Sequence, residues 1–162
     1  MKTRTKTIVG VVLTLIVAAI VVVFAFPQVA ATRYIYFDTN SGRLKVQCVS
    51  FGRIYHESVE ETEYSKLLKE FGFEEESADW RPAFSTELGI RRFFHPQNVS
   101  YPYGRVCARV KEFTMWLELQ EKADAREKRE QLAKFRVLVR EGSPEQIQEY
   151  VSSLLQQNAA SK

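Results

Sequence analysis

The sequence has little of what metal and cofactor sites are usually built from. It contains only 2 cysteines and 2 histidines, and neither type shows the CxxC or HExxH spacing of zinc sites. The glycine-rich phosphate-binding patterns G-x-x-x-x-G-K-[ST] and G-x-G-x-x-G are absent, as is the acidic loop of an EF-hand. We therefore expect no metal, no cofactor and no motif-defined catalytic residue.

The scarce cysteines, Cys48 and Cys107, leave two alternatives open. A disulfide between them requires an oxidising compartment, whereas two buried free thiols would behave as small apolar side chains. The sequence also gives little support for catalysis by these cysteines and histidines. On a strand, His56 and Glu57 point to opposite faces, and a dyad of Cys107 with His95 needs a proximity that the sequence does not indicate.

The chain also lacks a basic surplus outside its first residues. Its net charge of +3 comes from 23 Lys and Arg against 20 Asp and Glu. Three of those basic residues are Lys2, Arg4 and Lys6, so the rest of the chain is formally neutral. This balance argues against nucleic acid as a partner.

The strongest feature present is an apolar run from Ile8 to Phe26, in which Thr14 is the one polar residue. At about 1.5 Å per residue, a helix of this length would cross a bilayer. Because basic residues precede the run, the positive-inside rule predicts that residues 1–7 are a cytoplasmic tail. The sequence thus predicts a single-pass signal-anchor in the cell membrane over residues 8–26, with an extracytoplasmic domain after it.

A cleaved signal peptide is the alternative reading of this run. Pro27 would end the helix, and Val29, Ala30 and Ala31 supply small residues of the kind that signal peptidase reads. Cleavage following Ala31 would release a secreted protein. The length of the run favours the anchor, since cleaved apolar segments usually span about 7–15 residues.

Beyond a short linker at 27–32, residues 33–155 are expected to form one α+β domain, followed by a frayed tail at 156–162. Alternating and β-branched residues predict strands that turn at residues 39–42 and form an antiparallel meander. The expected strands are 33–38, 44–50 and 54–59. Thr62 then caps a helix over residues 63–71.

The carboxyl-terminal third reads as a helical hairpin. A long helix is expected from Arg105 to Gly142, stabilised by acid–base pairs at i,i+4 spacing. Ser143 and Gln146 have the spacing of a capping box for the next helix. Residues 74–104 are the least regular part, and within them Ile90–Phe94 are expected to form a further strand.

Arginine and aromatic residues concentrate between residues 91 and 105, and both types are enriched at the centres of protein interfaces. The candidate partner surface comprises Arg91, Arg92, Phe93, Phe94, His95, Tyr101, Tyr103 and Arg105. The alternative is that the basic residues of the longer segment 81–111 only complement the acidic residues of 57–79 within the fold.

We therefore expect a non-enzymatic module that binds another protein, as an accessory part of a membrane or envelope complex. The alternative is a small-ligand-binding protein or enzyme with a cleft between the meander and the helical hairpin, holding His95, Cys107 and nearby Arg and Tyr residues. A deep pocket that holds His95 or Cys107 with a carboxylate would favour this alternative.

Overall fold

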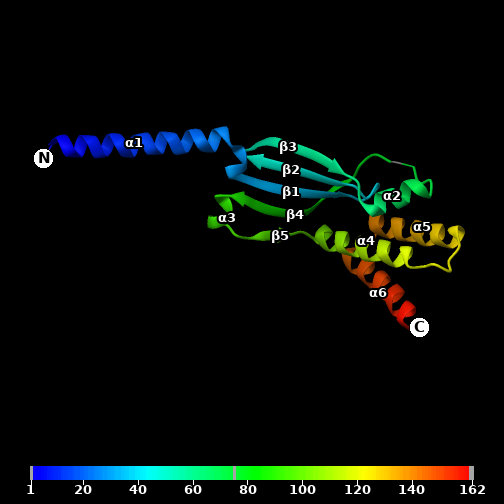
Figure 1. Ribbon diagram of the computed structural model, residues 1–162. Helices are drawn as coiled ribbons and strands as arrows, with labels where there is room; N and C mark the ends of the chain where they lie inside the picture. The colour runs from blue at the N-terminus through cyan, green and yellow to red at the C-terminus, as the bar shows by residue number, and fades with distance from the viewer. Residues whose placement is uncertain (1, 75, 161–162) are drawn as a thin grey trace.

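The chain forms an antiparallel sheet with helices gathered at one of its ends. The computed structural model describes residues 2–74 and 76–160. Figure 1 shows that α1 extends from one end of the sheet, whereas α2, α4, α5 and α6 lie at the other. The strands are β1 (Ala30–Asp38), β2 (Leu44–Ser50), β3 (Arg53–Glu60), β4 (Trp80–Gly89) and β5 (Asn98–Ser100). The helices are α1 (Lys2–Ala25), the 3-10 turn η1 (Pro27–Val29), α2 (Glu63–Glu70), α3 (Arg91–Phe94), α4 (Pro102–Glu118), α5 (Ala125–Glu141) and α6 (Pro144–Ala160).

The sheet has the strand order β3-β2-β1-β4-β5, and every neighbouring pair is antiparallel. The predicted α+β class and the meander of β1, β2 and β3 are therefore confirmed. β1 begins at Ala30, inside the stretch expected to be a linker. β4 was missed, because Pro82 interrupts its pattern and its buried residues, Ala83 and Ser85, are small.

A β-bulge in β4 fixes where α4 begins. The pairing with β1 steps from Ile35–Phe84 to Tyr36–Pro82, which leaves Ala83 as the extra residue. The Ala83 carbonyl accepts a hydrogen bond from the Tyr101 amide at 3.0 Å, directly before α4. A Cβ at Gly104 would lie 2.7 Å from that same carbonyl oxygen, so only glycine lets α4 approach the strand this closely.

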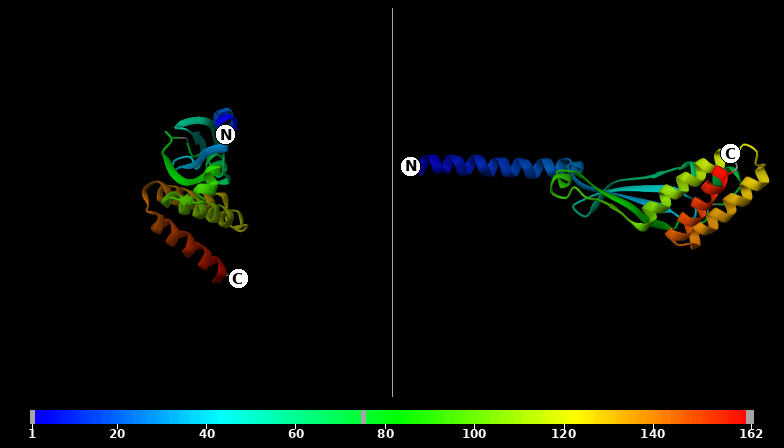
Figure 2. Two further views of the ribbon diagram at one scale, coloured as in Figure 1. Left: turned by 90° about the vertical axis from the view of Figure 1, so that its left-hand side faces the viewer. Right: turned by 90° about the horizontal axis from the view of Figure 1, so that it is seen from below.

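The hydrophobic core lies at the helical end of the sheet, where β1 and β4 meet the helices (Figure 2). Phe37 and Ala83 contribute from the strands. Phe113 of α4 stacks on Phe135 of α5 with ring centroids 3.9 Å apart, and Tyr64 of α2 meets Phe135 edge-on at 5.8 Å. The core also includes Leu68, Val106, Val110, Trp116, Leu117, Leu132, Val139, Ile147, Val151 and Leu154.

The long helix expected from Arg105 to Gly142 is wrong, because α4 ends at Glu118 and α5 starts at Ala125. Asp124 was expected to pair with Lys128 four residues later inside the long helix, but it lies at the start of α5. Instead it is the N-cap of α5, accepting a hydrogen bond from the Glu127 amide at 2.7 Å. The charged pattern suits two helices as well as one, so it could not reveal the break.

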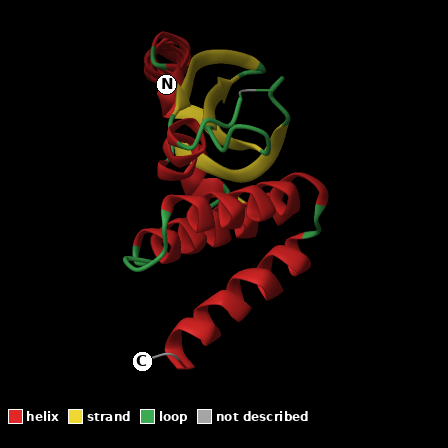
Figure 3. Cartoon of the chain, turned by 90° about the vertical axis from the view of Figure 1, so that its right-hand side faces the viewer, coloured by secondary structure: helices red, strands yellow, loops and turns green. Residues whose placement is uncertain are grey.

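The final helix begins as expected, since Ser143 and Gln146 exchange the hydrogen bonds of a capping box at 2.8 and 3.3 Å. Ile147, Val151 and Leu154 form its buried face. Figure 3 shows α6 crossing beneath the other helices, and its main contacts are with α4. It continues to Ala160, past the start of the expected frayed tail, of which Ser161 and Lys162 lie outside the described residues.

None of the helices in the described part of the chain combines the length and the apolar character that a membrane span requires. α1 includes the charged residues Lys2, Arg4 and Lys6. The predicted transmembrane signal-anchor over Ile8–Phe26 is therefore wrong, as is the single-pass cell-membrane topology with an extracytoplasmic domain.

The alternative of cleavage after Ala31 is also at odds with the structure. Ala30 and Ala31 belong to β1, where they pair with Gly89 and Leu88 of β4. Ala31 is fully buried. A cut at this position would remove the first residues of the central strand.

The stacked aromatic core yields a stability prediction. Phe135→Ala should lower the free energy of unfolding by about 3–5 kcal/mol, because it removes a ring that contacts three others. Val137→Ala, on the exposed side of the same helix, should change it by less than about 0.5 kcal/mol. Urea unfolding measures both values, and equal losses would contradict the assigned core.

Candidate functional site

The structure divides the candidate partner surface into two parts. The first part is α3 with its flanks, which forms one helical turn and not the expected strand. Phe93 is 88% exposed and Phe94 is 75% exposed, and Ile90 beside them is also exposed. The α3 turn, which carries both phenylalanines, lies at the end of the sheet that adjoins α1 (Figure 1).

The backbone that carries these aromatic side chains is held firmly against η1. The Ile90 amide donates a hydrogen bond to the Val29 carbonyl at 2.6 Å. Gly89 turns the chain here with φ of +55°, and a Cβ at this position would lie 2.1 Å from the Val29 carbonyl oxygen. The Arg91 guanidinium also pairs with the Glu87 carboxylate at 3.1 Å. The exposed phenylalanines thus sit on a fixed turn.

The second part of the predicted surface, Tyr101, Tyr103 and Arg105, belongs to the start of α4. Tyr101 is half-buried, and Tyr103 packs against the hydrophobic core. Arg105 forms an ion pair with Glu145 of α6 at 3.7 Å. These three residues help to dock α4, so we leave them out of the candidate surface.

Both cysteines are free thiols in the structure. Cys48 is buried in β2, where it faces His56 of β3, and Cys107 lies on α4 against the core. The disulfide considered from the sequence is not formed here. Burial raises the pKa of the Cys107 thiol to about 12, so the thiol stays protonated near neutral pH.

An apolar pocket of about 310 Å³ lies where β1 and β2 meet α2 and α4. The strands contribute Phe37 and Leu44, and the start of α2 contributes Thr62, Glu63 and Tyr64. One stripe along α4, at spacings of three and four residues, forms the remaining wall. This stripe consists of Cys107, Val110, Lys111, Thr114, Met115 and Glu118.

The pocket contains only some of the residues that the sequence predicted for a cleft. Its lining residues include Cys107, Glu63 and Glu118, but not His95, and the Glu63 carboxylate is paired with Lys66 at 2.6 Å. His95 instead follows α3 as its C-cap. The structure therefore does not bring the Cys107–His95 dyad together, and the protonated Cys107 thiol is poorly suited to nucleophilic attack.

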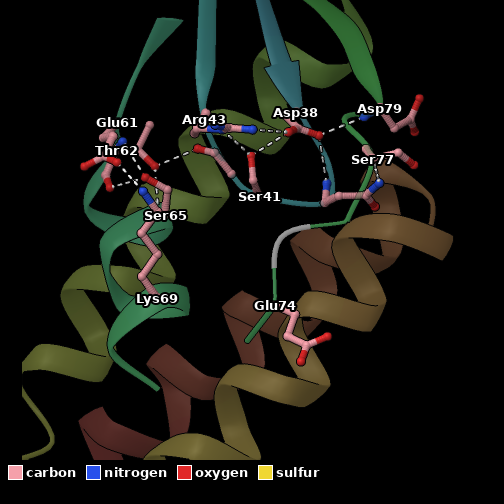
Figure 4. A network of polar contacts seen from close by, with 12 residues as sticks. Asp38, Ser41, Arg43, Glu61, Thr62, Ser65, Lys69, Glu74, Ser77 and Asp79 are labelled. Atoms are coloured by element: carbon pink, nitrogen blue, oxygen red, sulfur yellow. Dashed lines mark hydrogen bonds and ion pairs between the residues drawn. The ribbon is translucent and has the colours of Figure 1, made fainter. Parts of the chain in front are cut away.

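A buried carboxylate organises the turn between β1 and β2 (Figure 4). Asp38 is fully buried and accepts hydrogen bonds from the Asn40 amide at 3.1 Å, the Ser41 hydroxyl at 2.5 Å and the Asp79 amide at 2.9 Å. Arg43 adds an ion pair at 3.9 Å. This Asp38 network ties the turn to the segment before β4, and its contacts are those of a structural element.

Sequence reasoning identified this turn but missed the network. An Asp that accepts from the amide two residues later forms an Asx turn, and Asp38 followed by Asn40 fits that pattern. The link to Asp79 spans 41 positions, so no local pattern could indicate it.

The acidic segment 57–79 has several partners. Glu76 accepts hydrogen bonds from Arg136 and Arg140 of α5, at 3.1 and 3.0 Å. Asp79 pairs with Arg81 at 3.0 Å, which does join the acidic and basic segments. Glu75, in the same acidic loop, lies outside the described residues. The acidic residues of 57–79 therefore pair only in part with the basic residues of 81–111, because Glu76 pairs with α5 instead.

No protein-family model, curated protein or solved structure matches the chain. Across residues 2–74 and 76–160, no three His, Cys, Asp or Glu side chains are grouped so that they could hold a metal ion. Within the described part of the chain, two features are considered for a functional assignment: the apolar pocket and the α3 surface, defined as Ile90, Arg91, Arg92, Phe93, Phe94 and His95.

The Asp38 network predicts a position-specific stability effect. Asp38→Asn should lower the free energy of unfolding by about 2–3 kcal/mol, because one carboxylate oxygen and the charge are lost among buried donors. Asp124→Asn is the matched control, and it should change little because Asn is an equally good N-cap. Chemical denaturation compares the two variants, and similar effects would contradict a special role for Asp38.

The raised pKa of Cys107 predicts an unreactive thiol. At pH 8, Cys107 should react with N-ethylmaleimide about a thousandfold more slowly than an exposed cysteine of ordinary pKa, since only the thiolate attacks. The rate should still be rising with pH above 10, because the pKa is about 12. Peptide mass spectrometry after timed labelling measures the rate, and labelling as fast as that of glutathione would show that the assigned burial is wrong.

Proposed function

We propose that this protein is a non-catalytic module that binds a protein partner through the α3 surface. The observation that carries the proposal is the exposure of Phe93 and Phe94, at 88% and 75%. Burying one phenylalanine side chain is worth about 1.5–3 kcal/mol. Two adjacent rings left in solvent therefore offer substantial binding energy to a partner that covers them.

The fixed backbone around α3 supports the same proposal. Side chains on a pre-ordered turn lose less conformational entropy on binding than those on a loose loop. The hydrogen bond from Ile90 to Val29 and the ion pair of Arg91 with Glu87 provide this order. Glu87 is itself held by a hydrogen bond from the Thr32 hydroxyl at 2.9 Å, so the support reaches into β1.

Charge around the phenylalanines indicates the chemistry of the partner. Arg92 and His95 flank Phe93 and Phe94 in the sequence and are exposed to solvent, whereas the charge of Arg91 is already paired with Glu87. A complementary partner would present an apolar recess bordered by Asp or Glu side chains. Since Arg92 lies at the rim, its charge should influence the association rate and the salt dependence of binding more than the final affinity.

A site-specific crosslink tests the proposal. A photoreactive phenylalanine analogue at position 93, in the full chain in its native cells, should capture one defined protein. The same analogue at position 51 is the control, because Phe51 is 58% exposed and lies on the β2–β3 turn. Mass spectrometry identifies what is captured. Equal capture at both positions, or none at position 93, would refute the proposed surface.

Binding measurements with the captured partner then show how much each side chain of the α3 surface contributes. Phe94→Ala should weaken binding by at least tenfold, as expected of a central aromatic contact, whereas Phe51→Ala should have no effect. Arg92→Glu should slow association at low salt. Calorimetry and stopped-flow measurements provide these values, and circular dichroism checks that each variant is folded.

A further inference from the structure

The apolar pocket between α2 and α4 is a second feature, independent of the α3 surface. We infer that it binds a small uncharged apolar molecule. Its volume of about 310 Å³ is at the lower end of the range of small-molecule sites. It is about twice the engineered cavity that accommodates benzene in another protein.

The inner wall of the pocket offers apolar contact and few free polar groups. Phe37, Leu44 and Val110 supply hydrocarbon surface. The two threonine hydroxyls are already engaged: Thr62 donates to the Gly42 carbonyl at 2.7 Å, and Thr114 donates to the Val110 carbonyl at 2.8 Å. Among the described lining residues, the buried Tyr64 hydroxyl has no hydrogen-bond partner in the structure. A ligand with several polar groups would therefore lose more hydrogen bonds to water than this wall can replace.

The burial of Cys107 is consistent with an interior that disfavours charge. Burial is the largest cause of its raised pKa, which means that an anion at this wall is poorly stabilised. A charged ligand would meet the same penalty. The charged lining residues do not offer an anion a free positive site, because Lys111 is accompanied by Glu118, and Glu63 is paired with Lys66. An uncharged ligand avoids both costs.

Met115 provides an adaptable side of the pocket. Its side chain lines the pocket and is 53% exposed, so it lies where the pocket meets solvent. Unbranched methionine can rearrange around ligands of different shape at small energetic cost. The structure therefore indicates selectivity for apolar character and size more than for one exact ligand.

The methionines also make the inference testable. The chain contains only two, Met1 and Met115, so selective labelling of methionine methyl groups gives two NMR signals. We use the full chain and the neutral probe N-phenylnaphthylamine. The Met115 signal should shift in a saturable way, while the Met1 signal stays in place. A Met115 signal that does not move overturns the inference.

A variant that fills the pocket shows whether the probe binds there. Val110→Phe should weaken the Met115 response at least tenfold, whereas Val137→Phe on the exposed side of α5 should leave it unchanged. Thr114→Leu fills the same pocket from the next turn of α4, in case Val110→Phe does not fold. Probe binding to the exposed side chains of α1 would not depend on either substitution. An unchanged Met115 response in a folded filling variant overturns the site.

The ligand class is tested with a charged analogue of the same skeleton. Anilinonaphthalene sulfonate carries a permanent negative charge and should bind at least tenfold more weakly than the neutral probe. Equal or tighter binding of the sulfonate would overturn the uncharged class.

Discussion

The face-to-face contact between Phe113 and Phe135 is the interaction on which the rest of the structure depends. It joins α4 to α5, and Tyr64 extends it to α2. Phe37 and Ala83 bring the ends of two strands into the same cluster. Because the aromatic side chains bury large apolar areas, this cluster positions every helix that covers the end of the sheet. Among the described residues, no comparable core forms at the opposite end of the sheet, where the exposed side chains of α3 are found.

This uneven distribution of buried surface separates the two proposed sites. The apolar pocket borders the core and takes its walls from Phe37, Tyr64 and Val110, which also belong to the core cluster. The α3 surface depends instead on backbone contacts around Gly89 and η1. One site is built by packing and the other by a hydrogen-bonded turn, so a substitution in one need not disturb the other.

Local patterns predicted the elements whose evidence is local. The alternation in Leu44, Val46 and Cys48 indicated β2, and the capping residues Thr62 and Ser143 marked the starts of two helices. Local patterns failed to predict the elements whose structure depends on contacts between residues far apart in the chain. Trp80–Gly89 reads as irregular because its strand character comes from pairing with β1 and from a bulge that accommodates Pro82. The break between α4 and α5 was missed because charged pairs fit one helix or two.

By itself, the sequence determined the α+β class, the first three strands and the scarcity of catalytic motifs. These follow from hydrophobic period, turn residues and composition, which act over a few neighbouring residues. The tertiary structure decided that Tyr101, Tyr103 and Arg105 dock α4 while Phe93 and Phe94 remain exposed. It also decided that Cys107 faces an apolar pocket without His95. Such outcomes depend on which elements pack together, and packing joins residues that are far apart in the chain.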